Sequence, residues 1–256
     1  LSKNNVVREG SIGRGNPNLD PRVADNLDLS LEWYPSANSL FSIGGFFKSI
    51  DDPIFTSQET VRDFDFSGLT FERATLVQPV NAGTAELYGL EAAVDFRFES
   101  GLGLIETSSL LDDFGLTANV TVMDSELDGV PARPDETFSL VRQPDVIARL
   151  TPFYERGGFE ARLSYSYTGE QLTSINDTTP DVGVAQAGDG EFDEFLDARE
   201  TISASIRYTF DELLSISVSA ENLTEEPFRA FQGRSSNEEE FVARPAIYRV
   251  GLSSKF

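Results

Sequence analysis

The chain has 256 residues, contains neither cysteine nor histidine, and carries a formal net charge of −23. These totals exclude disulfides, thiolate nucleophiles, histidine-based catalytic triads and most zinc sites, and so acidic a surface is a poor partner for nucleic acid. No apolar run reaches the ~18 residues that a transmembrane helix requires, and the length suits one large all-β domain or two smaller ones.

Nine segments of the chain show the period-two alternation of a β-strand with one apolar and one polar face. The clearest is 84–99, where Leu90 lies on the apolar face and Glu91 on the polar face. The phase of the second segment is ambiguous, because 41–47 is apolar on both faces. In chain order the predicted strands are 24–34, 40–54, 84–99, 114–126, 144–155, 159–168, 201–211, 214–220 and 246–256.

The connections between these strands are alternately short and long. Turns are short after the first, fifth and seventh strands and moderate after the third. Segment 1–24 is predicted to be a loop, and 71–80 is a candidate hairpin that extends above the sheet. The long, acidic loops are 55–82, 127–143, 169–199 and 223–245. This pattern predicts an all-β, antiparallel up-and-down meander of about nine strands, as in outer-membrane β-barrels with short periplasmic turns and long extracellular loops.

The two faces of the predicted strands differ in chemistry. Aromatic residues gather on the apolar face near the short turns, which predicts contact with lipid; they are Trp33, Phe96, Phe98, Tyr154, Phe159, Phe210 and Phe256. The polar face carries charges that we expect to form a lumen-facing ladder of cross-strand ion pairs. Its members are Arg97, Arg149, Arg162, Arg207, Arg249, Glu91, Asp95 and Glu160. The ladder either stiffens the wall or contacts something inside the barrel.

The closing stretch, AIYRVGLSSKF, is similar to the assembly signal at the end of bacterial outer-membrane barrels. The similarity rests on Arg249, Gly251 and the terminal Phe256, whereas Ser254 stands where that signal usually has an apolar residue. Nine strands are too few, and an odd number, for a bacterial single-chain barrel. Because open sheet edges are an aggregation liability, we expect further N-terminal strands outside this chain.

Five stretches, in order, resemble the C-terminal half of the TonB-dependent receptors of Gram-negative bacteria. They are NPNLDP with NLDLSLEWYP, then FSIGGFFKSIDDPI, NAGTAELYGLEAAVDFRF, SVSAENLTEEPFR and the last strand. The resemblance implies that residues 1–256 are the C-terminal portion of a 22-stranded transmembrane β-barrel in the outer membrane, in contact with lipid and lipopolysaccharide. It also implies a plug domain and N-terminal strands beyond this chain, and coupling through a TonB box to the TonB–ExbB–ExbD complex.

The function that this resemblance implies is energised uptake of a scarce nutrient, such as a ferric siderophore, cobalamin, haem or an oligosaccharide. The alternatives are a passive outer-membrane porin and a soluble β-sandwich or adhesin domain. Enzymatic activity is not expected, because barrel hydrolases use a Ser–His pair and the neighbouring loop carboxylates are better explained as solvated charge. Asp189, Glu191 and Asp193 lie at every second position, with Gly188 and Gly190 interleaved, and calcium loops also use alternating oxygen ligands. The pattern is not that of an EF-hand, and we expect neither a metal site nor a cofactor.

Overall fold

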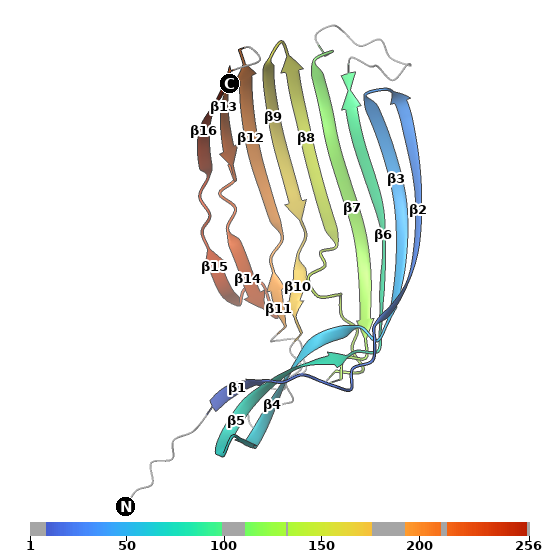
Figure 1. Ribbon diagram of the computed structural model, residues 1–256, viewed down its shortest axis with the longest axis vertical. Helices are drawn as coiled ribbons and strands as arrows, with labels where there is room; N and C mark the ends of the chain where they lie inside the picture. Colours follow the sequence, from blue (N-terminus) through green and yellow to red (C-terminus); the bar gives the residue numbers. More distant parts are fainter. Residues whose placement is uncertain (1–8, 99–110, 132, 176–192, 211–213, 255–256) are drawn as a thin grey trace, which may run out of the picture.

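The computed structural model describes residues 9–98, 111–131, 133–175, 193–210 and 214–254. The strands of this part of the chain form three sheets, of nine, four and three strands (Figure 1). None of the described residues belongs to a helix of the length and apolarity that crossing a membrane requires.

The nine-stranded sheet confirms the predicted meander. Every neighbouring pair is antiparallel, and the strands lie side by side in their chain order. The turns after β2 and β8 lie at one rim, and the strands of the two smaller sheets lie at the opposite rim (Figure 1). The nine strands are β2 (Val23–Ser36), β3 (Ser39–Asp51), β6 (Thr84–Arg97), β7 (Phe114–Asp128), β8 (Val146–Arg156), β9 (Phe159–Thr168), β12 (Arg199–Thr209), β13 (Leu214–Glu221) and β16 (Ile247–Ser254).

The pairing register is staggered across this sheet. One row of directly opposed residues starts at Trp33, near the short-turn end of β2, and reaches Ile202, near the loop end of β12. The row runs through Phe41, Val94, Ala118, Leu150 and Tyr165. The strands are therefore tilted relative to the rims, and such a tilt, typically about 35–45°, is what a sheet needs to curve into a barrel.

The apolar face of the sheet is open. The exposed fractions of Leu29, Leu90 and Val250 are 79%, 64% and 80%. In the described part of the chain no second layer of strands packs against these side chains. A soluble β-sandwich buries the inner face of each sheet against the other sheet, so the sandwich alternative is wrong.

Aromatic rings form a row on the apolar face near the short turns. Trp33 contacts Phe41 with 5.3 Å between the ring centroids, and Phe41 in turn lies 6.0 Å from Phe96. The row continues in the contacts Phe96–Phe98, Phe114–Tyr154, Tyr154–Phe159 and Tyr208–Phe210. The row therefore contains Phe41, Phe114 and Tyr208 in addition to the predicted aromatic residues. The predicted Phe256 lies outside the described residues. The pairing of Phe41 with Trp33 also settles the ambiguous phase of β3.

A three-stranded sheet replaces the first long loop and part of the N-terminal segment. It contains β1 (Glu9–Gly13), β4 (Ile54–Phe66) and β5 (Leu69–Asn81), with β1 parallel to β5. The candidate hairpin at 71–80 is confirmed and is longer than predicted, whereas the prediction of a loop was wrong for β1. The side-chain amide of Asn81 donates to the carbonyls of Asp20 and Asp52, at 3.1 and 3.0 Å, and so ties the base of the hairpin to the chain before β2.

A four-stranded sheet occupies the loop rim beside β9 and β12. Its strands, in spatial order, are β10 (Gln171–Ser174), β11 (Glu194–Leu196), β14 (Phe228–Gln232) and β15 (Glu238–Val242). The prediction of irregular loops at 169–199 and 223–245 was therefore wrong in these places. The strands are too short to show a clear alternation, and β15 begins with three glutamates, a residue depleted in strands.

A small hydrophobic core lies at the loop rim, where the connections pack on the ends of the strands. Its buried residues are Ala82, Ala85, Leu127, Val130, Phe138, Leu172 and Ile175, and Val130 is completely buried. The core joins the ends of β5, β6 and β7 to the connection after β7 and to β10. The loop rim therefore packs as a water-soluble protein does, while the strands beyond it keep an open apolar face.

Because the apolar face is open, an added charge should lower the free energy of unfolding more on the apolar face than on the polar face of the sheet. Leu90→Arg should destabilise the membrane-inserted protein by about 2–4 kcal/mol, the cost of an arginine on the lipid face near the bilayer midplane. Thr121→Arg, on the polar face opposite Glu91, should cost much less. Urea unfolding of the full-length protein in lipid vesicles measures both. Equal losses would contradict the assignment of the apolar face to lipid.

Candidate functional site: the polar face and the loop rim

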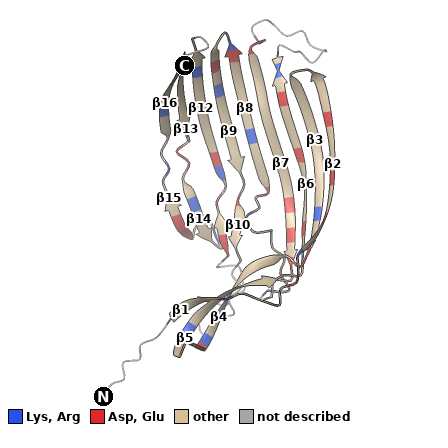
Figure 2. Cartoon of the chain, in the orientation of Figure 1, with Lys and Arg blue, Asp and Glu red and all other residues tan. Residues whose placement is uncertain are grey.

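The register places all eight members of the predicted charge ladder on the polar face of the nine-stranded sheet. Arg207 lies directly opposite Glu160, and Arg149 lies opposite Ser166, to which its Nε donates a hydrogen bond of 3.3 Å. Charged positions recur along most of the strands (Figure 2). That this face borders a water-filled lumen stays a prediction.

One row across the polar face, near the short turns, forms a compact cluster. Arg97, Gly115, Phe153 and Arg162 are consecutive partners in the register of β6, β7, β8 and β9. The ring of Phe153 lies on Gly115, where a Cβ atom would come within 2.1 Å of it, and Phe153 is only 4% exposed. The guanidinium groups of the two arginines lie 4.9 and 5.0 Å from the ring centroid, within the range of a cation–π contact.

Glu155 completes this cluster. Its carboxylate accepts a hydrogen bond of 2.8 Å from Arg97 and another from Arg162. Glu155 was missed in the sequence, although it continues the polar phase of β8. The signal that could have found the cluster is Phe153 itself, a large apolar side chain in the polar phase, opposite a glycine. A cavity of about 460 Å³ beside the cluster is lined by Asp95 and both arginines.

Two of the three residues of the predicted assembly signal are described. Arg249 forms an ion pair with Glu221 on the neighbouring strand. A Cβ atom on Gly251 would lie 2.7 Å from Ser217 Oγ, so the hydroxyl of Ser217 would have to shift to accept a side chain here. Phe256 lies outside the described residues, and a role of the three in barrel assembly stays a prediction.

A buried ion pair joins two connections at the loop rim. Arg133 Nη1 lies 2.6 and 2.8 Å from the two carboxylate oxygens of Asp193, and the side chains are 5% and 7% exposed. Arg133 also donates to Glu136, and its guanidinium lies 4.4 Å from the ring centroid of Phe138. The contact fixes the chain just before β11 to the connection after β7.

This ion pair bears on the calcium pattern seen in the sequence. Asp189 and Glu191 lie outside the described residues, and both oxygens of Asp193 accept hydrogen bonds from Arg133. Within the described ranges no cluster of acidic side chains has the geometry of a metal site. Asp193 is therefore a structural partner of Arg133.

Charge pairing shifts the pKa values of this group. Burial lowers the pKa of Arg133, but hydrogen bonds to Glu136 and Asp193 outweigh it and raise that pKa. The hydrogen bond from Arg133 in turn lowers the pKa of Glu136. Arg133 therefore holds its proton more tightly than an ordinary arginine, and Glu136 loses its proton more readily than an ordinary glutamate.

Two glutamates of the loop rim show the opposite shift. Burial raises the pKa of Glu194 in β11, and the charge of Glu239 adds to the effect. Burial also raises the pKa of Glu170, with smaller contributions from the charges of Asp197 and Asp145. These carboxyl groups take up a proton more readily than ordinary glutamates.

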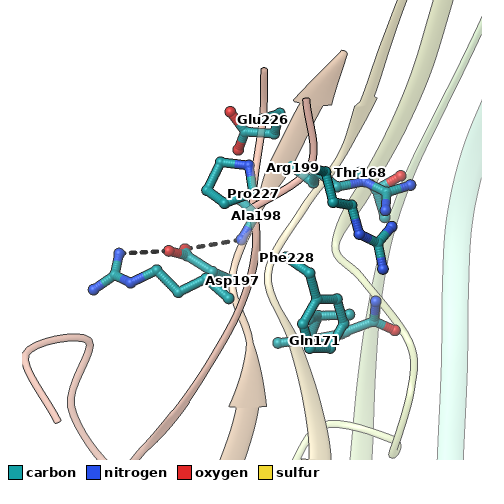
Figure 3. Close-up of a pocket in the computed structure, with 11 residues that line it drawn as sticks. Thr168, Gln171, Asp197, Ala198, Arg199, Glu226, Pro227 and Phe228 are labelled. Atoms are coloured by element: carbon teal, nitrogen blue, oxygen red, sulfur yellow. Dashed lines mark hydrogen bonds and ion pairs between the residues drawn. The ribbon is translucent and has the colours of Figure 1, made fainter. Parts of the chain in front are cut away.

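Two adjoining cavities lie where the polar face meets the four-stranded sheet. Their volumes are about 360 and 450 Å³, and Arg199, Glu226 and Arg244 line both. The smaller one is also lined by Thr168, at the end of β9, and by Phe228, at the start of β14 (Figure 3). The cavities therefore lie between the wall and the loops.

Comparison with known families identifies the chain. The family model described as TonB dependent receptor-like, beta-barrel, matches residues 4–223. The chain belongs to this family. The nine strands are therefore part of a TonB-dependent receptor β-barrel, which is not closed within this chain. No curated protein matches the chain significantly.

Solved structures with the same fold are receptors and transporters. The ferric enterobactin receptor PfeA of Pseudomonas aeruginosa is 15% identical with a TM-score of 0.61, over 95% of this chain and 32% of that one. The siderophore receptor PirA of Acinetobacter baumannii is 16% identical with a TM-score of 0.59, over 95% and 33%. The copper transporter OprC is 16% identical with a TM-score of 0.60, over 95% and 34%. The chain thus spans about one third of these proteins.

The buried ion pair predicts a large loss when one partner is removed. Arg133→Met should destabilise the loop rim by about 3–5 kcal/mol, because it leaves the carboxylate of Asp193 buried without its partner. Arg156→Met is the matched control, because Arg156 is 68% exposed and lies 3.4 Å from Asp113, a geometry worth about 0–1 kcal/mol. Hydrogen exchange of residues 133–141 and 171–175 measures the effect, and equal protection in both variants would contradict it.

The raised pKa of Glu194 predicts a pH-dependent stability of the four-stranded sheet. A carboxyl group whose pKa is raised by folding stabilises the fold below its unfolded pKa, and this contribution is lost as the pH rises through the folded pKa. Glu194→Gln should therefore raise the unfolding temperature at pH 7 and leave it unchanged near pH 4. Glu136→Gln should lower the unfolding temperature at pH 7, because folding lowers the pKa of Glu136 and its ionised form therefore stabilises the fold. Thermal scans at both pH values measure this, and a Glu194→Gln effect independent of pH would contradict it.

Proposed function

We propose that this chain forms part of the wall and the extracellular loops of an outer-membrane transporter that takes up a scarce nutrient with energy from the TonB–ExbB–ExbD complex. The observation that carries the proposal is the single tilted sheet with an open apolar face and a charged polar face, in a chain of the TonB-dependent receptor family. Such a sheet is suited to separating lipid from water.

The proposal includes partners outside this chain. Further strands would close a 22-stranded barrel with β2 and β16, whose outer edges have no partner strand in the described part of the chain. A plug domain would fill the barrel against the polar face and carry the contact with TonB. Outer-membrane lipid and lipopolysaccharide would contact the apolar face and the outer side of the loops.

The proposed cargo is a scarce metal or its chelate. This choice is supported by the printed names of structural neighbours, which are a ferric enterobactin receptor, a ferric citrate transporter and a copper transporter. Cobalamin, haem and an oligosaccharide remain further candidates from the family resemblance. A passive porin would share the wall, so the energy requirement separates the two functions.

Uptake measurements test the proposal. A strain that lacks the full-length gene should lose uptake of one of the candidate iron or copper complexes, and the reintroduced gene should restore it only when the TonB–ExbB–ExbD complex is present. Radiolabelled cargo and a matched strain without the energy complex provide the comparison. Uptake that does not depend on the TonB–ExbB–ExbD complex would contradict the proposal and favour a porin.

A further inference from the structure

The two adjoining cavities at the loop end of the polar face have an unusual distribution of charge. Arg229, which lines the smaller cavity, is neutralised, because its guanidinium lies 2.7 Å from Asp197 and 3.2 Å from Glu238. Asp197 also accepts a hydrogen bond of 2.9 Å from the backbone of Ala198 (Figure 3). The two other arginines are Arg199 and Arg244, and among the described residues no carboxylate forms an ion pair with either.

The remaining contacts of these two arginines leave their donors available. Arg244 lies with its guanidinium 5.3 Å from the centroid of the Phe228 ring, so the ring supports one face of the group. Arg199 begins β12 opposite Thr168, on the polar face of the sheet. The smaller cavity is lined by three arginines and by the carboxylates of Asp197 and Glu226, so its lining has an excess of one positive charge in a chain whose net charge is −23. The charges that line the larger cavity balance, because Glu221, the ion-pair partner of Arg249, also lines it.

Asn222, which lines the larger cavity, ties two segments of the cavity lining together. Its side-chain amide donates to the carbonyl of Arg244 at 2.7 Å and to the carbonyl of Glu226 at 3.2 Å, and its side-chain oxygen accepts from the backbone of Glu226 at 3.0 Å. Asn222 adopts a φ of 55°, a left-handed conformation that asparagine tolerates well. The two chain segments that carry Arg244 and Glu226 are therefore fixed to each other before any ligand binds.

The chemistry of the lining indicates one class of ligand. Guanidinium groups present planar forks of donors that match carboxylate and phosphate oxygens in pairs, and Thr168 and Gln171 add polar groups on the β9 side. A volume of about 360 Å³ lies within the usual range for small-molecule sites. We propose that the cavity lined by Arg199 and Arg244 binds a carboxylate or phosphate group of a solute that enters from the loop side. This proposal rests on the proposed function, because the solute would be part of the transported cargo.

Titration calorimetry of the full-length protein in detergent, with citrate and inorganic phosphate as probes, tests this site. Arg199→Gln and Arg244→Gln should each weaken binding of the better probe about tenfold or more, because each removes charge-assisted hydrogen bonds. Glu226→Gln should strengthen binding several-fold, because it removes the repelling carboxylate. Arg156→Gln, which removes the same charge from the opposite rim, should bind as the wild-type protein does.

The outcomes separate this site from the proposed function. Wild-type protein that binds neither anion, or arginine variants that keep wild-type affinity while folded by gel mobility, would overturn the anion site even if uptake depends on TonB–ExbB–ExbD. An equal loss in Arg156→Gln would also overturn it, because the effect would then be one of net charge. Weaker anion binding that is confined to Arg199→Gln and Arg244→Gln supports the site, even if uptake proves independent of the energy complex.

Discussion

The constraint on which the structure depends is that backbone N–H and C=O groups have no water to bond in the hydrocarbon of a bilayer. The seven inner strands of the nine-stranded sheet meet it by pairing with a neighbour on each side, whereas the outer edges of β2 and β16 have no partner strand in the described part of the chain. Side-chain alternation then gives the sheet one apolar and one polar face, as in the step from Leu90 to Glu91, and these faces suit contact with lipid and with water respectively. The large exposed fractions of the apolar face, which would be a defect in a soluble protein, follow from this constraint.

At the loop rim, different interactions stabilise the same chain. At the loop rim water is available, and the connections bury Val130 and its neighbours in a small core. The ion pair between Arg133 and Asp193 lies beside that core, with both side chains nearly inaccessible. Burying two charges is costly unless the geometry is good, and here four carboxylate oxygens, two each from Asp193 and Glu136, and the ring of Phe138 surround a single guanidinium. Connections that are far apart in sequence are thereby held together.

Arginine has a separate role on each part of the polar face. Near the short turns, Arg97 and Arg162 are held on Phe153 and share the carboxylate of Glu155, which makes them part of the wall. At the loop end, Arg199 and Arg244 line a cavity without carboxylate partners among the described residues. Because the rest of the chain is strongly acidic, an arriving anion is repelled by most of the surface and attracted at this cavity. The contrast favours binding of an anion at this cavity over binding elsewhere on the surface.

The sequence by itself determined the fold class, the nine strands of the main sheet and the face of each ladder residue, because period-two alternation and turn spacing are local properties of the chain. It also indicated the family, through the resemblance of five stretches taken in order. It did not reveal β1 or the four-stranded sheet, whose short strands are specified by partners distant in sequence. Nor did it reveal that Gly115 lets Phe153 lie between Arg97 and Arg162, or that Arg133 meets Asp193. These contacts depend on the register between strands and on the packing of connections, and only the tertiary structure decides both.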